Sequence, residues 1–429
     1  MRTSILFGII MMLLLSLPAA ASDYTLGIFG NANEDETINM QDVTYTELII
    51  LEYRDRTELA DGKYDGKINM QDVTQIELVI LGKEKELTVL DLADRAVTIN
   101  KPVERVVPLF NFEEYLAVEG GEEPFEKIVG WTRDYWEGRR QWIWEKYTDA
   151  FPEIDDIPDV GYIHKGTFSA EKTISLGPDV VIMTVLNYDG ARDDISRLEQ
   201  AGIPTICVDY HIQTVEAHAK STLMLGYVLG EEERAQDLVD FYTEHVGEVY
   251  SRLEDVDGEK PEVYVECAHK GPSEYSNTYG NYMWGALVEN CGGINIAKDV
   301  IEKYGPINPE YLLDANPDVI ILTGSYWPAT PDSMRLGYYA DPDESRELLN
   351  GFTERPGWDT LDAVKNDRVH SIHHGLSRHL YDFVAVQYFA KCFYPDEFED
   401  LDPEEDLREF HERFMPVEYS GVWMLSIEE

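Results

Sequence analysis

Positive charge is scarce in this sequence. Lys and Arg together number 35 against 83 Asp and Glu, which gives a formal net charge of −48 at pH 7. A surface this acidic repels nucleic-acid phosphates and anionic membranes, so electrostatic binding to either partner is excluded. The acidic residues are spread along the whole chain. This distribution suits either a protein adapted to high salt or simply an acidic extracellular protein.

Recognisable catalytic motifs are also missing. The sequence has no Gly-x-Ser-x-Gly nucleophile motif, no Gly-x4-Gly-Lys-Ser/Thr phosphate loop and no His-Glu-x-x-His zinc motif. We therefore expect a protein that is not an enzyme.

Cysteine is rare as well, with four residues, Cys207, Cys267, Cys291 and Cys392. Three of them lie in or beside apolar stretches, which favours buried free thiols. Their spacing alone leaves a disulfide open as the alternative.

A long apolar run occurs once, at residues 5–17. It follows Arg2 and precedes Pro18 and three alanines, which is typical of an export signal peptide over residues 1–22 rather than of a membrane span. No cysteine follows closely to carry a lipid anchor. We expect the mature chain to begin near Ser22 and to be extracytoplasmic and soluble, either secreted or at the cell surface.

A repeat of 30 residues organises the first part of the chain, because residues 38–44 return unchanged as residues 68–74. Each copy contains the end of a 12-residue loop. Alternate positions of this loop carry oxygen ligands of the kind that calcium prefers. The predicted calcium ligands are Asn31, Asn33, Asp35, Thr37, Asn39 and Asp42 in the first loop, and Asp61, Asp65, Lys67, Asn69 and Asp72 in the second. Thr37 and Lys67 would contribute backbone carbonyls. An apolar helical stripe follows each loop.

This paired-loop segment, residues 23–86, resembles a dockerin, the calcium-binding module that docks onto cohesins. Asp rather than Glu at the last loop position agrees with that family. The sequence departs from the pattern where Glu36 replaces the turn glycine and where Lys63 occupies a ligand position. The resemblance implies bound calcium and a cohesin-like or other cell-surface partner. A metal-free pair of helices is the alternative.

A second repeat, with an offset of 139 residues, aligns residues 171–184 with residues 310–323. Each copy reads as a short helix, a Pro-Asp turn and a buried strand. Further apolar strands are predicted at residues 105–109, 127–131, 204–208, 262–266 and 368–372. Such strands alternating with helices indicate parallel sheets. We expect an α/β N-terminal lobe over residues 87–230, a long connecting helix over 231–255 and an α/β C-terminal lobe over 256–429.

Residues 87–429 resemble the substrate-binding proteins of ABC importers for iron-siderophores, haem and cobalamin. The resemblance rests on the hairpin at 94–99, the paired Pro-Asp-Val repeats, the single long helix and the Gly-Gly-Ile-Asn segment at 292–295. It implies two Rossmann-like lobes flanking a ligand cleft, and a monomer that delivers a metal chelate to a membrane permease. It also places Glu171 and Glu310 at the permease-docking positions. The alternative role of both is that of carboxylates favoured at a helix N-terminus.

Ligand candidates follow from the rule that ligands bind beyond the carboxyl ends of parallel strands. The residues after the predicted strands include many aromatic rings, which suit a large planar chelate, and three cations, which suit its carboxylate or catecholate charges. The candidates are Phe110, Trp131, Arg133, Tyr135, Trp136, Tyr188, His269, Lys270, Tyr326, Trp327, His373, His374 and Arg378.

Four histidines, at positions 370, 373, 374 and 379, cluster within ten residues. They could bind a free divalent metal ion directly, or one of them could cap a chelated metal. Ordinary core and loop roles are the third possibility.

A different class of function, a calcium-dependent adhesion protein or surface scaffold, remains the alternative to the importer interpretation. In that case residues 23–86 would carry the function of the protein.

Overall fold

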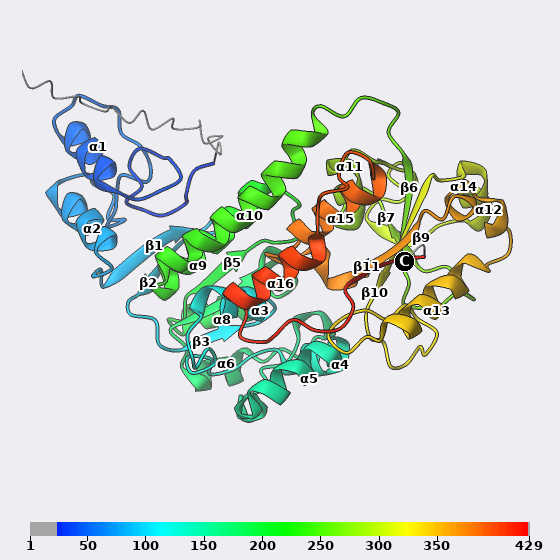
Figure 1. Cartoon of the computed structure of the whole chain (residues 1–429). Coiled ribbons are helices and arrows are strands. Elements are labelled where there is room, and N and C mark those ends of the chain that lie inside the picture. The colour runs from blue at the N-terminus through cyan, green and yellow to red at the C-terminus, as the bar shows by residue number, and fades with distance from the viewer. Residues whose placement is uncertain (1–23, 428–429) are drawn as a thin grey trace, which may run out of the picture.

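The computed structural model describes residues 24–427 and consists of two α/β lobes with a small N-terminal segment beside the first (Figure 1). The predicted signal peptide, residues 1–22, lies outside the described residues. We call residues 24–85 the N-terminal segment, residues 87–230 the N-lobe and residues 256–427 the C-lobe.

The N-terminal segment contains two helices of equal length, α1 (Met40–Ile50) and α2 (Met70–Ile80). Both begin with the same capping box. The Asn39 side chain accepts a hydrogen bond from the first turn of α1, and the Asp42 carboxylate accepts one from the backbone N–H of Asn39. Asn69 and Asp72 repeat this at α2. The 30-residue sequence repeat is therefore a structural repeat.

This segment is not separated from the N-lobe by a free linker. Residues 82–85, which carry several charges, form a turn that leads into β1 (Glu86–Leu90), which pairs with β2 (Ala96–Asn100). Ile28 forms an antiparallel bridge with Val89 of β1, and one apolar core continues from the segment into the N-lobe. Buried Glu84 lies 3.7 Å from Lys101. The charged residues at this turn thus do not mark a flexible connection.

The N-lobe is built on a three-stranded parallel sheet with the order β3-β4-β5. Its strands are β3 (Val106–Pro108), β4 (Val180–Thr184) and β5 (Thr205–Val208), and its helices are α3 (Phe112–Glu119), α4 (Arg133–Arg139), α5 (Gln141–Ala150), α6 (Ala170–Leu176), α7 (Val185–Gly190), α8 (Arg192–Gln200) and α9 (Val215–Leu229). The strand predicted at 127–131 is reduced to one bridge between Ile128 and Val106, because Trp131 pairs with Asp159 instead.

The C-lobe is built on a five-stranded sheet with the order β12-β11-β10-β6-β8, in which only β12 is antiparallel. Its strands are β6 (Glu262–Cys267), β8 (Ile294–Asn295), β10 (Val319–Gly324), β11 (Val369–His373) and β12 (Met424–Ser426), with a separate pair β7 (Asn277–Tyr279) and β9 (Tyr304–Pro306). Its helices are α11 (Trp284–Asn290), α12 (Pro309–Ala315), α13 (Pro342–Thr353), α14 (Asp362–Lys365), α15 (Phe383–Phe393) and α16 (Pro403–Phe414). The two predicted α/β lobes are confirmed.

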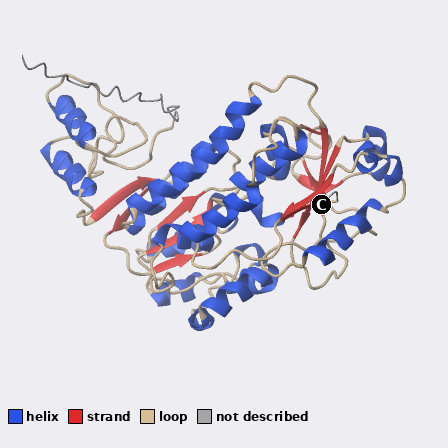
Figure 2. Ribbon diagram, viewed as in Figure 1, coloured by secondary structure: helices blue, strands red, loops and turns tan. Residues whose placement is uncertain are grey.

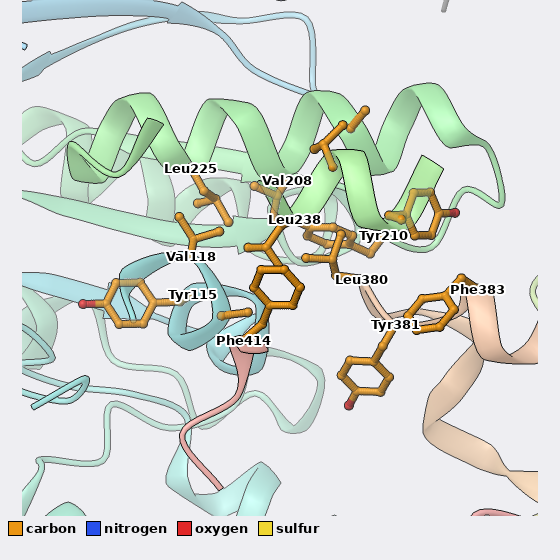
Figure 3. Close-up of a cluster of buried hydrophobic side chains, with 14 of the residues drawn as sticks. Tyr115, Val118, Val208, Tyr210, Leu225, Leu238, Leu380, Tyr381, Phe383 and Phe414 are labelled. Carbon is orange, nitrogen blue, oxygen red and sulfur yellow. The ribbon is translucent and has the colours of Figure 1, made fainter. Parts of the chain in front are cut away.

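The connecting helix is α10 (Glu232–Leu253), which packs against α9 and α15 and runs between the lobes (Figure 2). Residues of both lobes meet in one apolar cluster around it (Figure 3). Leu238 of α10 lies there beside Tyr210 of the N-lobe and Leu380 of the C-lobe. All three are buried. The lobes are therefore packed together through a shared core.

Candidate functional site

A cleft between the two lobes is the candidate site. Its N-lobe wall consists of Phe110, Tyr135, Gly138, Arg139, Arg140, Tyr162, His164, Leu186 and His211, and its C-lobe wall of Cys267, His269, Asn277, Tyr279, Tyr282, Met283, Tyr304, Trp327, His374 and Arg378.

The strand ends place many of these residues in the cleft. Phe110 follows β3 and His211 follows β5, while Cys267 ends β6 and His374 directly follows β11. The carboxyl ends of the strands in both sheets therefore point toward the same space, which is where open α/β sheets bind ligands.

The charge of the cleft is opposite to that of the protein. Its lining includes Arg139, Arg140 and Arg378 and no Asp or Glu. Within the described residues, none of the three arginines has a carboxylate within ion-pair distance. The Nε atom of Arg378 is buried without a hydrogen-bond partner, and Arg140 Nε donates to the Tyr135 hydroxyl at 3.1 Å. Three guanidinium groups are thus available to an anionic ligand.

Below the cleft, two buried carboxylates of the N-lobe face the C-lobe. Glu114 lies 2.6 Å from His379 Nδ1, and Glu113 accepts a hydrogen bond from Tyr381 at 3.1 Å. Burial raises the pKa of Glu113. Burial lowers the pKa of His379, but Glu114 and Glu113 raise it more, so that its pKa lies above the usual value. These contacts join the lobes at the floor of the cleft.

The cleft histidines are neutral, because burial lowers their pKa. The pKa of His211 falls to about 4 and that of His374 to about 3, with His269 shifted in the same direction. His269 Nδ1 lies 2.6 Å from the Ser276 hydroxyl, and His374 Nδ1 lies 2.8 Å from the Thr323 hydroxyl. These contacts fix both rings, and the arginines alone supply the positive charge.

Aromatic rings form much of the remaining wall. Phe110 packs on Tyr135 at 5.0 Å between ring centroids, and Tyr135 packs on Tyr162 at the same distance. On the opposite wall, Trp327 lies between His269 and His374, 5.9 Å from each. Such surfaces stack on planar or apolar groups.

Six of the predicted ligand residues line the cleft: Phe110, Tyr135, His269, Trp327, His374 and Arg378. Five of them follow a strand, as the strand-end rule requires, whereas Tyr135 lies in α4 after the isolated bridges of Ile128 and Trp131.

The other seven predicted ligand residues lie elsewhere. Trp131, Trp136 and His373 are buried in the core. Arg133 pairs with Glu137 and Asp155, and Lys270 pairs with Glu274. Tyr188 lies against Arg95 and Arg192, and Tyr326 stacks on Trp142. Their side chains are thus held by partners outside the cleft lining.

Sequence reasoning missed two of the three cleft arginines. Arg139 is the last residue of α4, and Arg140 lies between α4 and α5, away from any strand end. An adjacent arginine pair in so acidic a chain was the available signal. His211 follows the predicted strand at 204–208, so the strand-end rule itself would have found it. The tyrosines between 279 and 304 had no such signal.

The four histidines of the cluster have different surroundings. His370 packs on Tyr388, His373 packs on Trp423, His379 contacts Glu114, and His374 lines the cleft. Among residues 24–427, no three side chains of His, Cys, Asp or Glu are grouped to hold a metal ion. Direct binding of a free divalent ion by this cluster therefore lacks a geometric basis.

The first calcium-type loop contains an unsatisfied oxygen. The Oδ1 atom of Asn31, at its first position, is buried without a hydrogen-bond partner. Asp42, at its last position, accepts hydrogen bonds from the backbone of Asn33 and Asn39. In the second loop, Arg56 lies 3.7 Å from Asp61. The two loops thus share a backbone design and differ in their local charge.

Glu171 and Glu310 occupy equivalent places in the two lobes. They lie exposed in the first turns of α6 and α12. Glu171 has Arg197 3.6 Å away. The pseudo-symmetric surface position predicted from the repeat is present.

Residues 122–375 match the model of the periplasmic binding protein family. The chain belongs to this family. The predicted class of function, the substrate-binding protein of an ABC transporter, is thereby confirmed. The matched residues include most of the cleft lining but not Phe110 or Arg378, and they exclude the N-terminal segment. In the part of the chain that the structure describes, no helix is both long and apolar enough for a membrane span.

Related proteins agree with this assignment. The TroA-like periplasmic binding protein FepB from Veillonella parvula is 42% identical, with a TM-score of 0.76, over 79% of this chain and 99% of that one. The molybdate-binding protein MolA of Haemophilus influenzae is 22% identical over 77% of this chain and 91% of its own length. YvrC of Bacillus subtilis, an uncharacterised ABC transporter substrate-binding lipoprotein, is 25% identical over 73% and 87%.

Proposed function

We propose that this protein captures an anionic metal chelate, such as an iron(III)-siderophore, in the cleft and delivers it to a membrane permease. One observation carries the proposal: three arginines without ion-pair partners line a cleft that contains no carboxylate, in a chain with a net charge of −48. Selection for an acidic surface alone would not gather unpaired arginines in one cleft and keep carboxylates out of it. A negatively charged ligand accounts for this arrangement.

The aromatic walls favour a chelate over a small inorganic oxyanion. Molybdate, which the related MolA binds, offers oxygen atoms to guanidinium groups but no surface to the rings. A catecholate or haem-like ligand uses both the arginines and the faces of Phe110 and Trp327. Haem and cobalamin are therefore alternative cargoes of the same site.

Delivery would use Glu171 and Glu310. Their exposed, pseudo-symmetric positions suit basic residues on two related permease subunits. The protein would act without enzymatic chemistry and as a monomer.

The N-terminal segment would be a calcium-binding, dockerin-like module that holds the protein near the cell surface. Asn31 Oδ1 and the repeated loops support a calcium site, with Asn31, Asn33, Asp35, the Thr37 carbonyl, Asn39 and Asp42 as the first ligand set. When bound, calcium would rigidify the loops. Arg56 beside Asp61 makes the second loop the weaker site.

Adhesion is the second candidate function, and one observation favours it. Met40 and Met70, at the starts of α1 and α2, are both more than half exposed, as are Leu51 and Leu81 at their ends. The repeat thus presents the same apolar residues twice, as a protein-binding surface would. A cohesin-like or other surface protein is the proposed partner.

Titration calorimetry on the full mature chain tests chelate capture, with iron(III) tris-catecholate, haemin, cyanocobalamin and molybdate as probes. We expect one chelate to bind below about 1 µM. Replacing Arg378→Gln should then weaken binding by about 1.5–3 kcal/mol, or roughly 10- to 150-fold, because one charged hydrogen-bond donor is lost.

The matched control is Arg413→Gln, because Arg413 is a solvent-exposed arginine paired with Glu409 on α16. The affinity of the Arg413→Gln variant for the chelate should equal that of the unmodified protein. Equal affinities for Arg378→Gln and the control, or no binding by any probe, would refute the anionic-ligand assignment.

A further inference from the structure

Helix α5 has two faces that contact different lobes. Ile143, Trp144 and Tyr147 are buried in the N-lobe core, where Trp144 packs on Trp131 at 5.1 Å. Trp142 and Lys146 lie on the opposite side and reach the C-lobe, as does Asp149 one turn further on. Their spacing of four and three residues puts these three on one helix face. We call Trp142, Lys146 and Asp149 the latch face.

The contacts of the latch face are few and only partly buried. Trp142 stacks on Tyr326, with ring centroids 4.3 Å apart and planes at 1°. Asp149 accepts a hydrogen bond from Tyr339 at 2.8 Å, and Lys146 donates one to Ser420 at 3.1 Å. The N-lobe face of α5, in contrast, is fully buried. If the lobes separate, α5 stays with the N-lobe and the latch face parts from the C-lobe.

The stack lies at the edge of the cleft. Trp142 is two residues from Arg140, and Tyr326 is next to Trp327, and both of these neighbours line the cleft. The lobes are also joined by α10 and, at the cleft floor, by Glu114 and His379. Widening the cleft about those joints must break the stack, because Trp142 belongs to α5 of the N-lobe and Tyr326 follows β10 of the C-lobe.

We propose that the latch face acts as a gate. Its Trp142–Tyr326 stack holds the cleft closed, and separation of the two rings opens the cleft and so controls exchange of the ligand. Arg140, which lines the cleft, is the residue directly before α5, so the gate also bears on the position of a ligand arginine. This inference deepens the proposed function and rests on it only for the identity of the ligand that enters and leaves the cleft.

The cleft carries a native probe of opening that needs no ligand. Cys267 and Cys207 are both buried, but Cys267 lines the cleft, whereas Cys207 lies in β5 of the N-lobe sheet, away from the cleft. The test is the rate at which N-ethylmaleimide modifies each thiol of the full mature chain, followed by peptide mass spectrometry. Modification of Cys267 should be faster in Trp142→Ala and in Tyr326→Ala by about three- to tenfold, as expected when one aromatic pair is lost.

Three further results are expected. The double variant should react no faster than the faster single variant, because both remove one contact. Trp142→Phe, which keeps a ring in the stack, should restore the original rate, and Cys207 should react equally in all variants. If Trp142→Ala does not fold, Tyr326→Ala removes the same stack from the other lobe.

An unchanged rate of Cys267 modification in the alanine variants would overturn the gate proposal. An equal rise in the rate of Cys207 modification would also overturn it, since that would indicate that the whole fold has become less stable. Failure of every chelate to bind would refute the proposed function and leave this result standing, so the two failures are distinguishable.

Discussion

At the scale of single residues, the cleft floor depends on a buried histidine. His379 has a raised pKa because Glu114 and Glu113 outweigh the effect of its burial. A group whose pKa is higher in the folded than in the unfolded state stabilises the fold below its unfolded pKa, about 6.5, and loses this contribution as pH rises through the folded pKa.

We therefore expect the stability difference between the unmodified protein and His379→Gln to be largest near pH 6 and to shrink as pH rises toward 9. Urea unfolding at several pH values measures it. The control His411→Gln removes a buried histidine whose pKa is lowered by burial to about 4, so its stability difference should not shrink as pH rises. A difference for His379→Gln that grows with pH would contradict the assignment of the ion pair.

Individual residues also show how much of the site could be predicted from the sequence. Phe110 and Arg378 were predictable because strand ends point to the cleft, whatever the details of packing. Lys270 and Arg133 were not separable from them, since only the folded structure shows that Glu274 and Asp155 engage those cations. Which positive charges remain unpaired is a tertiary property, and it decides the chemistry of this cleft.

At the scale of elements, helix α10 joins the lobes through its buried face. Its length was predictable from the spacing of apolar residues, and the structure agrees within a few residues at each end. The bridge made by α5 was not predictable, because its latch face contacts residues 190 and 274 positions further along the chain.

Truncating Leu238→Ala on α10 should lower the free energy of unfolding by about 2–5 kcal/mol, since the residue is fully buried in the shared core. Urea denaturation with fluorescence detection measures this. The nearby Gln236, on the same helix, forms a hydrogen bond only with exposed Asp240, so Gln236→Ala should cost less than about 0.5 kcal/mol. Equal losses in the two variants would show that the core is not continuous there.

At the scale of the whole molecule, the N-terminal segment and the N-lobe should unfold together. Ile28 pairs with β1, and the apolar core is continuous across them. If calcium binds the proposed loops, its binding energy stabilises everything that unfolds with them. Calcium should therefore raise the midpoint of the main thermal transition, and magnesium at the same concentration should raise it less.

Differential scanning calorimetry in calcium and in a chelator measures this shift. Asp42→Ala removes a proposed ligand and should abolish most of it, whereas Glu47→Ala, an exposed substitution on α1, should not. A calcium-dependent transition separate from the main one would show that the segment unfolds independently.

The pairing of Ile28 with Val89 also bears on where the chain can be divided. Leu87 and Val89 are completely covered, in part by the residues before them. A protein expressed from residue 87 onward would begin with an uncovered edge strand that carries apolar side chains, a feature that promotes association between copies. The family match starts well after this strand, yet we expect the smallest unit that stays monomeric to include the segment in front of it.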